Sequence, residues 1–230
     1  MSWTDDKKAV WVDMPDTDHY EDRMGDYACG VDSGVVTSFL SGCESPVLDM
    51  PCGGGRFTRL LSTMGYDVVG GDYSASMINT AVKRSGGCYV HGDVFRLPFK
   101  SGSFSTILTM RLVFHYFQPV EILAEAHRVL RPGGVYIFDT LNRYSVRYFI
   151  DLAIRLFRRE GKRLWFITPK AMKALLESSG FEVVDSDSAY ALPSRAYRWL
   201  PRFFRRLDGI WPESVRTVTY WKVRERGTVR

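Results

Sequence analysis

The chain has 230 residues, of which 45% are hydrophobic and 25% charged, a composition typical of a globular protein with its own core. No run of about 18 uncharged apolar residues occurs, so we expect no transmembrane helix, and the acidic first residues exclude a standard signal peptide. The four cysteines are scattered without metal-ligand spacing, which predicts reduced thiols in a cytoplasmic protein and no metal site.

The net charge of +5 is distributed unevenly along the chain. Residues 1–140 contain 12 Lys/Arg and 17 Asp/Glu, a balance of −5, whereas residues 141–230 contain 19 and 9, a balance of +10. Segregated charge of this kind is typical of a surface that meets an anionic partner. If the protein has such a surface, it is expected in the last 90 residues.

Apolar runs alternate with helical patterns in the first 140 residues. After a short helix over residues 31–40, the patterns predict strands at 46–50, 68–72, 88–90, 104–110 and 135–138 and helices at 57–64, 75–82 and 120–130. Strands that alternate with helices at this rhythm indicate a parallel sheet with right-handed crossovers.

The rhythm changes after residue 140. The sequence there predicts a basic amphipathic helix at 143–163, and then a second helix at 169–179 with a proline at its start. A strand at 181–184, an irregular Arg- and aromatic-rich stretch at 191–212 and a final strand at 214–223 are expected to follow. Strict alternation in the last strand indicates an antiparallel edge strand. The expected fold is an α/β three-layer sandwich with a mostly parallel seven-stranded sheet and an antiparallel last strand.

The first strand leads into a turn of three glycines, Gly53, Gly54 and Gly55. The turn lacks the Gly-Lys-Ser/Thr ending of a phosphate-binding loop, and Thr58 stands where the dinucleotide fingerprint requires glycine. Asp49, at the end of the strand, would repel a pyrophosphate and attract a cationic group. Because Gly53 and Gly55 let the backbone approach a ligand closely, the turn predicts binding of S-adenosylmethionine, an adenosyl ligand with a cationic centre.

Carboxylates also follow the next two strands. Asp72 lies seventeen residues after the turn, where it can accept hydrogen bonds from ribose hydroxyls, and Asp93 can accept one from an adenine amino group. Met77 and Val94 are expected to supply apolar faces to the adenine ring. Since the carboxyl ends of parallel strands share one edge of the sheet, we expect Asp49, Asp72 and Asp93 to face the same crevice.

These motifs resemble class I S-adenosylmethionine-dependent methyltransferases, in particular the small-molecule branch that includes the quinone-biosynthesis methyltransferases. The resemblance covers residues 44–140 and is carried by segments 47–55, 70–77, 92–104 and 130–134, with a weaker match over 169–184. Two positions depart from the pattern: Pro51 stands where the branch commonly has glycine, and Ser105 replaces an acidic residue. The resemblance implies a Rossmann-like fold and a transferase that methylates a small or lipid-linked acceptor, at oxygen or carbon.

The resemblance also implies a division of the chain and further site residues. Residues 1–43 would form an N-terminal arm or lid, 44–140 the cofactor-binding core, and 141–230 the completion of the sheet with basic, aromatic insertions on the substrate side. Tyr73, and Arg111 through its backbone, would contact the cofactor. His115, after the fourth strand, is the candidate general base, needed only if the acceptor arrives protonated; alternatively it orders the loop.

The basic C-terminal region leaves three interpretations open. Arginines mixed with apolar residues over 143–163 and 195–206 suit peripheral contact with an anionic membrane, which would fit a lipid-borne acceptor. The apolar residues could instead roof the substrate pocket, or the region could contact RNA. No Asn/Asp-Pro-Pro-aromatic tetrapeptide of nucleic-acid amino-methylases occurs, which disfavours nucleic acid. The alternative function is an RNA- or membrane-surface-binding protein that keeps the cofactor fold without turnover.

Overall fold

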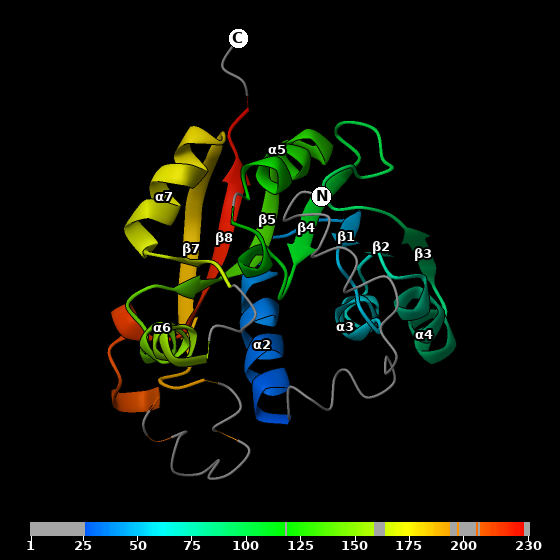
Figure 1. The fold of residues 1–230 in the computed structure, drawn as a ribbon. Coiled ribbons are helices and arrows are strands. Elements are labelled where there is room, and N and C mark those ends of the chain that lie inside the picture. Colours follow the sequence, from blue (N-terminus) through cyan, green and yellow to red (C-terminus); the bar gives the residue numbers. More distant parts are fainter. Residues whose placement is uncertain are drawn as a thin grey trace.

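The structure is a computed structural model that describes residues 26–117, 119–158, 164–193, 197, 206 and 208–227. Its centre is one sheet with the strand order β3-β2-β1-β4-β5-β8-β7, and β6 pairs with β5 beside this path (Figure 1). The strands are β1 (Val47–Asp49), β2 (Val68–Asp72), β3 (Cys88–His91), β4 (Phe104–Thr109), β5 (Leu130–Asn142), β6 (Phe166–Ile167), β7 (Phe181–Ala189) and β8 (Val218–Glu225).

Pairing within the sheet is parallel except at β8, which runs antiparallel to both β5 and β7. The prediction of a mostly parallel seven-stranded sheet with an antiparallel last strand is therefore confirmed. Two details differ from the sequence-based expectation. The last strand lies inside the sheet, between β5 and β7, and not at its edge. One additional strand, β6, was not predicted, because its two residues are too few to produce a periodic pattern.

Helices cover both faces of this sheet. They are α2 (Asp26–Phe39), α3 (Arg56–Thr63), α4 (Ala75–Ser85), α5 (Val120–Val129), α6 (Val146–Arg158) and α7 (Pro169–Ser178), with short 3-10 turns η1 (Val113–His115) and η3 (Glu213–Val215). Ser74 caps α4 by accepting a hydrogen bond from the Met77 N–H. None of the helices within the described residues is long and apolar enough to cross a membrane.

The strands bury alternate residues in two separate cores. One core joins the sheet to α2 and α3, and in β1 it takes Val47; the other joins the sheet to α5 and α7 and takes the next residue, Leu48. β4 divides in the same way, with Leu108 in the first core and Ile107 in the second. Because both faces are covered, these strands consist of continuous apolar runs, which is why they could be located in the sequence.

The C-terminal elements begin and end elsewhere than predicted. β7 continues past residue 184 to Ala189, because its polar half still pairs with β8 at the edge of the sheet. β8 starts at Val218, since Glu213–Val215 form η3. α6 ends within the predicted basic helix, and residues 159–163 lie outside the described part of the chain, as do 195–206 apart from Tyr197 and Arg206.

Candidate cofactor site at the carboxyl ends of the strands

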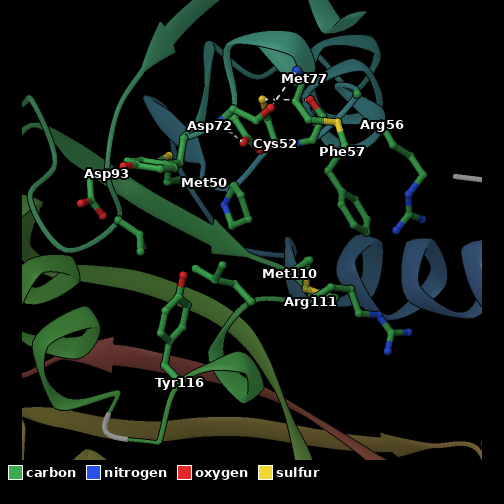
Figure 2. Close-up of a pocket in the computed structure, with 17 residues that line it drawn as sticks. Met50, Cys52, Arg56, Phe57, Asp72, Met77, Asp93, Met110, Arg111 and Tyr116 are labelled. Carbon is green, nitrogen blue, oxygen red and sulfur yellow. Dashed lines mark hydrogen bonds between the residues drawn. The ribbon is translucent and has the colours of Figure 1, made fainter. Parts of the chain in front are cut away.

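A cavity that is open to solvent lies at the carboxyl ends of the parallel strands. Its 17 lining residues come from the turn after β1, the start of α3, the end of β2, the start of α4 and the loops after β3 and β4 (Figure 2). Seven of the nine predicted cofactor-binding residues line it: Gly53, Asp72, Tyr73, Met77, Asp93, Val94 and Arg111. Motifs spread over 59 positions of sequence, from 53 to 111, are thus brought to one cavity.

Asp72 fixes the shape of the glycine turn. Its Oδ2 accepts a hydrogen bond from the Gly53 N–H at 2.9 Å, and its Oδ1 accepts one from the Ser74 N–H at 2.9 Å. Gly53 has φ 52°, and a Cβ added there would meet no atom within 4 Å, so this backbone borders open space. Burial raises the pKa of the Asp72 carboxyl, and the backbone N–H groups of Ser74 and Gly53 oppose that rise.

Gly55 has a different environment from Gly53. It caps α3 with φ 83° and does not line the cavity. A Cβ at this position would lie 3.0 Å from both the Ala81 Cβ and the Tyr89 hydroxyl. The glycine is therefore required for close packing of α3 against α4 and β3, and its predicted contact with a cofactor stays a prediction.

Asp49 lies one residue before Met50, the first residue of the cavity lining, and is fully buried. Its Oδ2 accepts a hydrogen bond from the Thr58 hydroxyl at 2.6 Å, whereas its Oδ1 has no hydrogen-bond partner within the described residues. Burial raises the pKa of this carboxyl to about 7, against the opposing effects of Thr58 and Arg56. A buried carboxylate oxygen left unsatisfied beside a cavity fits a cationic ligand.

The thiol beside Asp49 in the turn is not a nucleophile. Burial, together with the charges of Asp49 and Asp72, raises the pKa of the Cys52 thiol above its usual range. Only the thiolate is a good nucleophile, so Cys52 is a neutral part of the cavity wall.

The candidate base His115 ends η1 and is half-buried, with its ring against Phe114 at a centroid distance of 4.7 Å. It does not line the cavity, whereas its neighbour Tyr116 does, with the hydroxyl directed into it (Figure 2). Burial, then the charge of Asp93, raises the pKa of Tyr116 to about 12, so this hydroxyl stays protonated. Sequence analysis missed Tyr116, although an aromatic residue that follows the fourth strand closely was a usable signal.

Arg111 occupies the loop after β4 with φ 61°, an unusual value for a residue other than glycine. Its N–H donates to Asp139 Oδ1 at 2.6 Å, so the backbone donor is already engaged. Its guanidinium donates to both oxygens of Asp32, at 2.6 and 3.1 Å. Asp32 lies in α2, is fully buried and also accepts from the hydroxyls of Tyr190 and Tyr220.

The predicted N-terminal arm divides into two parts. Residues 1–25 lie outside the described residues, whereas Asp26–Phe39 form the packed helix α2. Tyr27 of α2 donates to Asp208 Oδ2 at 2.6 Å and stacks on Tyr197, so it faces the C-terminal segment. The lid function of the arm stays a prediction.

An open sheet with helices on both faces and a cavity at its carboxyl edge defines a Rossmann-like, nucleoside-binding class of protein. Residues 48–138 match the family model described as "Methyltransferase domain". An uncharacterized methyltransferase of Synechocystis sp. is 35% identical over 143 residues, which cover 60% of this chain and 67% of the relative. The chain therefore belongs to the S-adenosylmethionine-dependent methyltransferase family.

Further relatives agree with this assignment. A ubiquinone biosynthesis O-methyltransferase of Roseobacter denitrificans is 31% identical over 150 residues, which cover 60% of each protein. The chain thus matches only 60% of that relative's length. An S-adenosylmethionine-dependent methyltransferase of Thermotoga maritima has the same fold, with a TM-score of 0.71 at 19% identity over 96% of this chain and 99% of the other. Haemonchus contortus phosphoethanolamine N-methyltransferase 2, in complex with S-adenosyl-L-methionine, also has this fold. Its TM-score is 0.69 at 13% identity, and the match covers 98% of this chain and 60% of the other.

The raised pKa of Asp49 predicts a specific pH dependence of stability. Between the ordinary aspartate value of 3.8 and about 7, the folded chain holds a proton that the unfolded chain has released. Stability contributed by this group therefore falls as pH rises through that interval. Asp49→Asn cannot ionise, yet its amide oxygen can still accept from Thr58. Its free energy of unfolding should decline less steeply than the wild type's between about pH 4 and 7, measured by urea denaturation. Parallel curves would contradict the assignment.

Proposed function

We propose that this protein transfers the methyl group of S-adenosylmethionine to a small or lipid-linked acceptor, at oxygen or carbon, in the cytoplasm. The observation that carries the proposal is the single cavity in which Asp72, Asp93 and the Gly53 turn meet. The name of the Roseobacter relative, an O-methyltransferase of ubiquinone biosynthesis, supports an oxygen acceptor.

The side chains of the cavity suit the parts of S-adenosylmethionine, which when bound supplies a methyl group activated by a sulfonium. Asp72 would accept hydrogen bonds from the ribose hydroxyls, since each of its oxygens keeps a lone pair beside its backbone donor. Asp93 would accept from the adenine amino group, and the buried Val94 and Leu112 would pack on the ring. Asp49 would stabilise the cationic end through its unpaired oxygen.

Catalysis in such a site is mainly positioning and desolvation. Met50 and Met110, both buried, line the cavity and would exclude water from the reacting groups. Tyr116 can orient an acceptor by donating a hydrogen bond but, with a pKa of about 12, cannot serve as a base at neutral pH. A protonated acceptor therefore needs another base, and we propose His115, which an acceptor extending past Tyr116 could reach.

A lipid-linked acceptor is supported by α6. This helix exposes a row of apolar side chains, with Phe149 60%, Leu156 73% and Phe157 87% exposed, and basic residues follow it in the sequence up to position 163. Apolar side chains beside basic ones suit a membrane surface with anionic lipids. The protein would then be cytoplasmic and bind the membrane peripherally.

Asp72→Asn tests the cofactor assignment. It replaces an acceptor-only carboxylate by an amide, and losing a hydrogen bond to a charged group should lower the affinity for S-adenosylmethionine on the order of 10- to 100-fold. Isothermal titration measures this, with a melting curve to verify folding. Asp67→Asn, at an exposed aspartate before β2, is the matched control and should bind like the wild type. Equal affinity of the two variants would contradict the proposal, and tight binding without incorporation of labelled methyl into a metabolite extract would favour the non-catalytic alternative.

His115→Ala tests the proposed base. With an acceptor found by labelled-methyl incorporation, turnover should fall on the order of 100-fold or more, because general base catalysis contributes that much. The affinity for S-adenosylmethionine should not change, since His115 does not line the cavity. His127→Ala, at a histidine that pairs with Glu225 outside the cavity, is the control. Wild-type turnover in His115→Ala would remove this role.

The double variant Leu156→Ser, Phe157→Ser tests the membrane surface. The wild type should co-sediment with vesicles that contain anionic phosphatidylserine and be released as salt is raised, because screening weakens the electrostatic part. The double variant should remain in the supernatant at low salt, whereas Val82→Ser, at an exposed valine of α4, should bind like the wild type. Equal recovery of the wild type with neutral and anionic vesicles would refute the surface.

A further inference from the structure

The loop that follows β3 carries two residues of the cavity lining, Asp93 and Val94, on a stretch of chain that contains no helix and no strand longer than a single bridge. Its first end is tied to the sheet, because the Gly92 N–H donates to the Asp72 carbonyl at 3.0 Å. A Cβ added at Gly92 would lie 3.0 Å from the Pro98 Cδ, so the two ends of the loop approach each other closely. The loop is therefore compact, and its position depends on what holds its second end.

The second end is held by an ion pair on the helix α5. Arg128 donates through Nη1 to the Phe99 carbonyl at 2.8 Å and through Nη2 to the Leu97 carbonyl at 3.1 Å. The Leu97 N–H in turn donates to Glu125 Oε1 at 2.6 Å. Backbone groups outside helices and strands need partners from elsewhere, and here two side chains supply partners for three of them.

The two side chains of this pair also hold each other. Arg128 donates to both oxygens of Glu125, through Nε at 2.8 Å and through Nη2 at 2.6 Å. Hydrogen bonding by Arg128 lowers the pKa of Glu125, so the carboxylate stays charged. A partly exposed ion pair between helix neighbours adds little stability by itself, whereas its paired, directed N–H donors fix the loop backbone that they reach.

The backbone fixed in this way leads directly to the Asp93 carboxylate. Asp93 Oδ1 accepts a hydrogen bond from the Phe95 N–H at 3.0 Å, and the Asp93 carbonyl accepts one from the Arg96 N–H at 2.9 Å. This tight turn ends at Leu97, which the pair on α5 holds by both its N–H and its carbonyl. A displacement of Leu97 would therefore move the carboxylate within the cavity.

The position of this carboxylate determines how well one base can be told from another. A carboxylate accepts a hydrogen bond from the amino group of adenine, whereas a base with a carbonyl at that position presents a second acceptor, which the carboxylate repels. Hydrogen bonds weaken steeply as distance and angle become unfavourable. A small shift of the loop would thus reduce selectivity between bases before it abolishes binding.

We propose that Glu125 and Arg128 are positioning residues of the cofactor site, which set the place of Asp93 and with it the selectivity for adenine. The inference rests on the proposed function, in which Asp93 accepts from the adenine amino group. Neither residue of the pair lines the cavity. Both act through the backbone of Leu97 and Phe99, and not by contact with a ligand.

The first arm of the test uses Arg128→Gln, which removes the fork at a side chain that is 36% exposed. Isothermal titration compares S-adenosylhomocysteine with S-inosylhomocysteine, in which a carbonyl replaces the amino group of the base. The wild type should prefer the adenine compound on the order of 10- to 100-fold, as expected for a hydrogen bond to a charged group. Arg128→Gln should lose most of this preference, whereas a general loss of stability would weaken both compounds alike and leave the preference unchanged.

Arg131→Gln is the matched control, since Arg131 donates to the Ser105 hydroxyl at 3.1 Å and neither of these residues lines the cavity. This variant should keep the wild-type preference. If Arg128→Gln shows no cooperative melting transition, Arg128→Lys takes its place with the same expectation, because lysine keeps the charge but lacks the planar fork.

The second arm measures hydrogen exchange of segment 92–99 in the ligand-free protein. Exchange should be faster in Arg128→Gln than in the wild type and Arg131→Gln, because local opening is easier where the backbone is held less firmly. An Arg128→Gln variant that keeps the preference, an unchanged exchange rate, or a wild type that binds both compounds equally overturns the proposal. A wild type that binds neither compound refutes the proposed function instead, and the exchange rates still decide whether the pair fixes the loop.

Discussion

The buried ion pair between Asp32 and Arg111 holds together parts of the chain that no local pattern joins. Asp32 belongs to α2, Arg111 to the loop after β4, and the tyrosines that also donate to Asp32 come from the end of β7 and from β8. Removing one partner of a buried ion pair leaves the other charge buried without compensation, which typically costs about 3–5 kcal/mol. Since a whole domain is stable by roughly 5–15 kcal/mol, these elements must assemble together.

The same interaction explains the backbone of the loop that borders the cavity. Arg111 adopts a positive φ, which costs on the order of 1–3 kcal/mol for a residue other than glycine. The strain persists because Asp139 accepts from its N–H while Asp32 holds its side chain, so both ends of the residue are fixed. Burial raises the pKa of Asp139 to about 6, and the charge of Arg111 opposes that rise. The loop after β4 is thus positioned by β5 and α2.

Contacts between neighbouring segments could be predicted from the sequence, whereas contacts between distant elements could not. The Gly53 turn and Asp72 lie within twenty residues of each other and contact one another directly, so the local pattern was enough to predict that they lie together. Arg56 and Tyr116 lie beside predicted residues, but their positions in the cavity wall depend on α2 and on the packing of η1, which no spacing encodes. One signal was present for Asp32: it stands among Ala28, Val35, Val36 and Phe39 on the buried side of α2, where a carboxylate requires a partner.

Folding and ligand binding should therefore be linked through α2. A ligand that binds only the folded state adds stability in proportion to the logarithm of its concentration relative to its dissociation constant. At one end of the cavity, Asp72 organises a turn from neighbouring segments, so a ligand bound there would stabilise local structure. At the other end, Arg56 and Arg111 already anchor α2 through Asp32, so a ligand that contacts them would stabilise the packing of distant elements. The two ends of the cavity therefore depend on different contacts: the end at Asp72 on contacts between neighbouring segments of the Rossmann-like core, and the end at Arg111 on tertiary contacts to α2, β7 and β8.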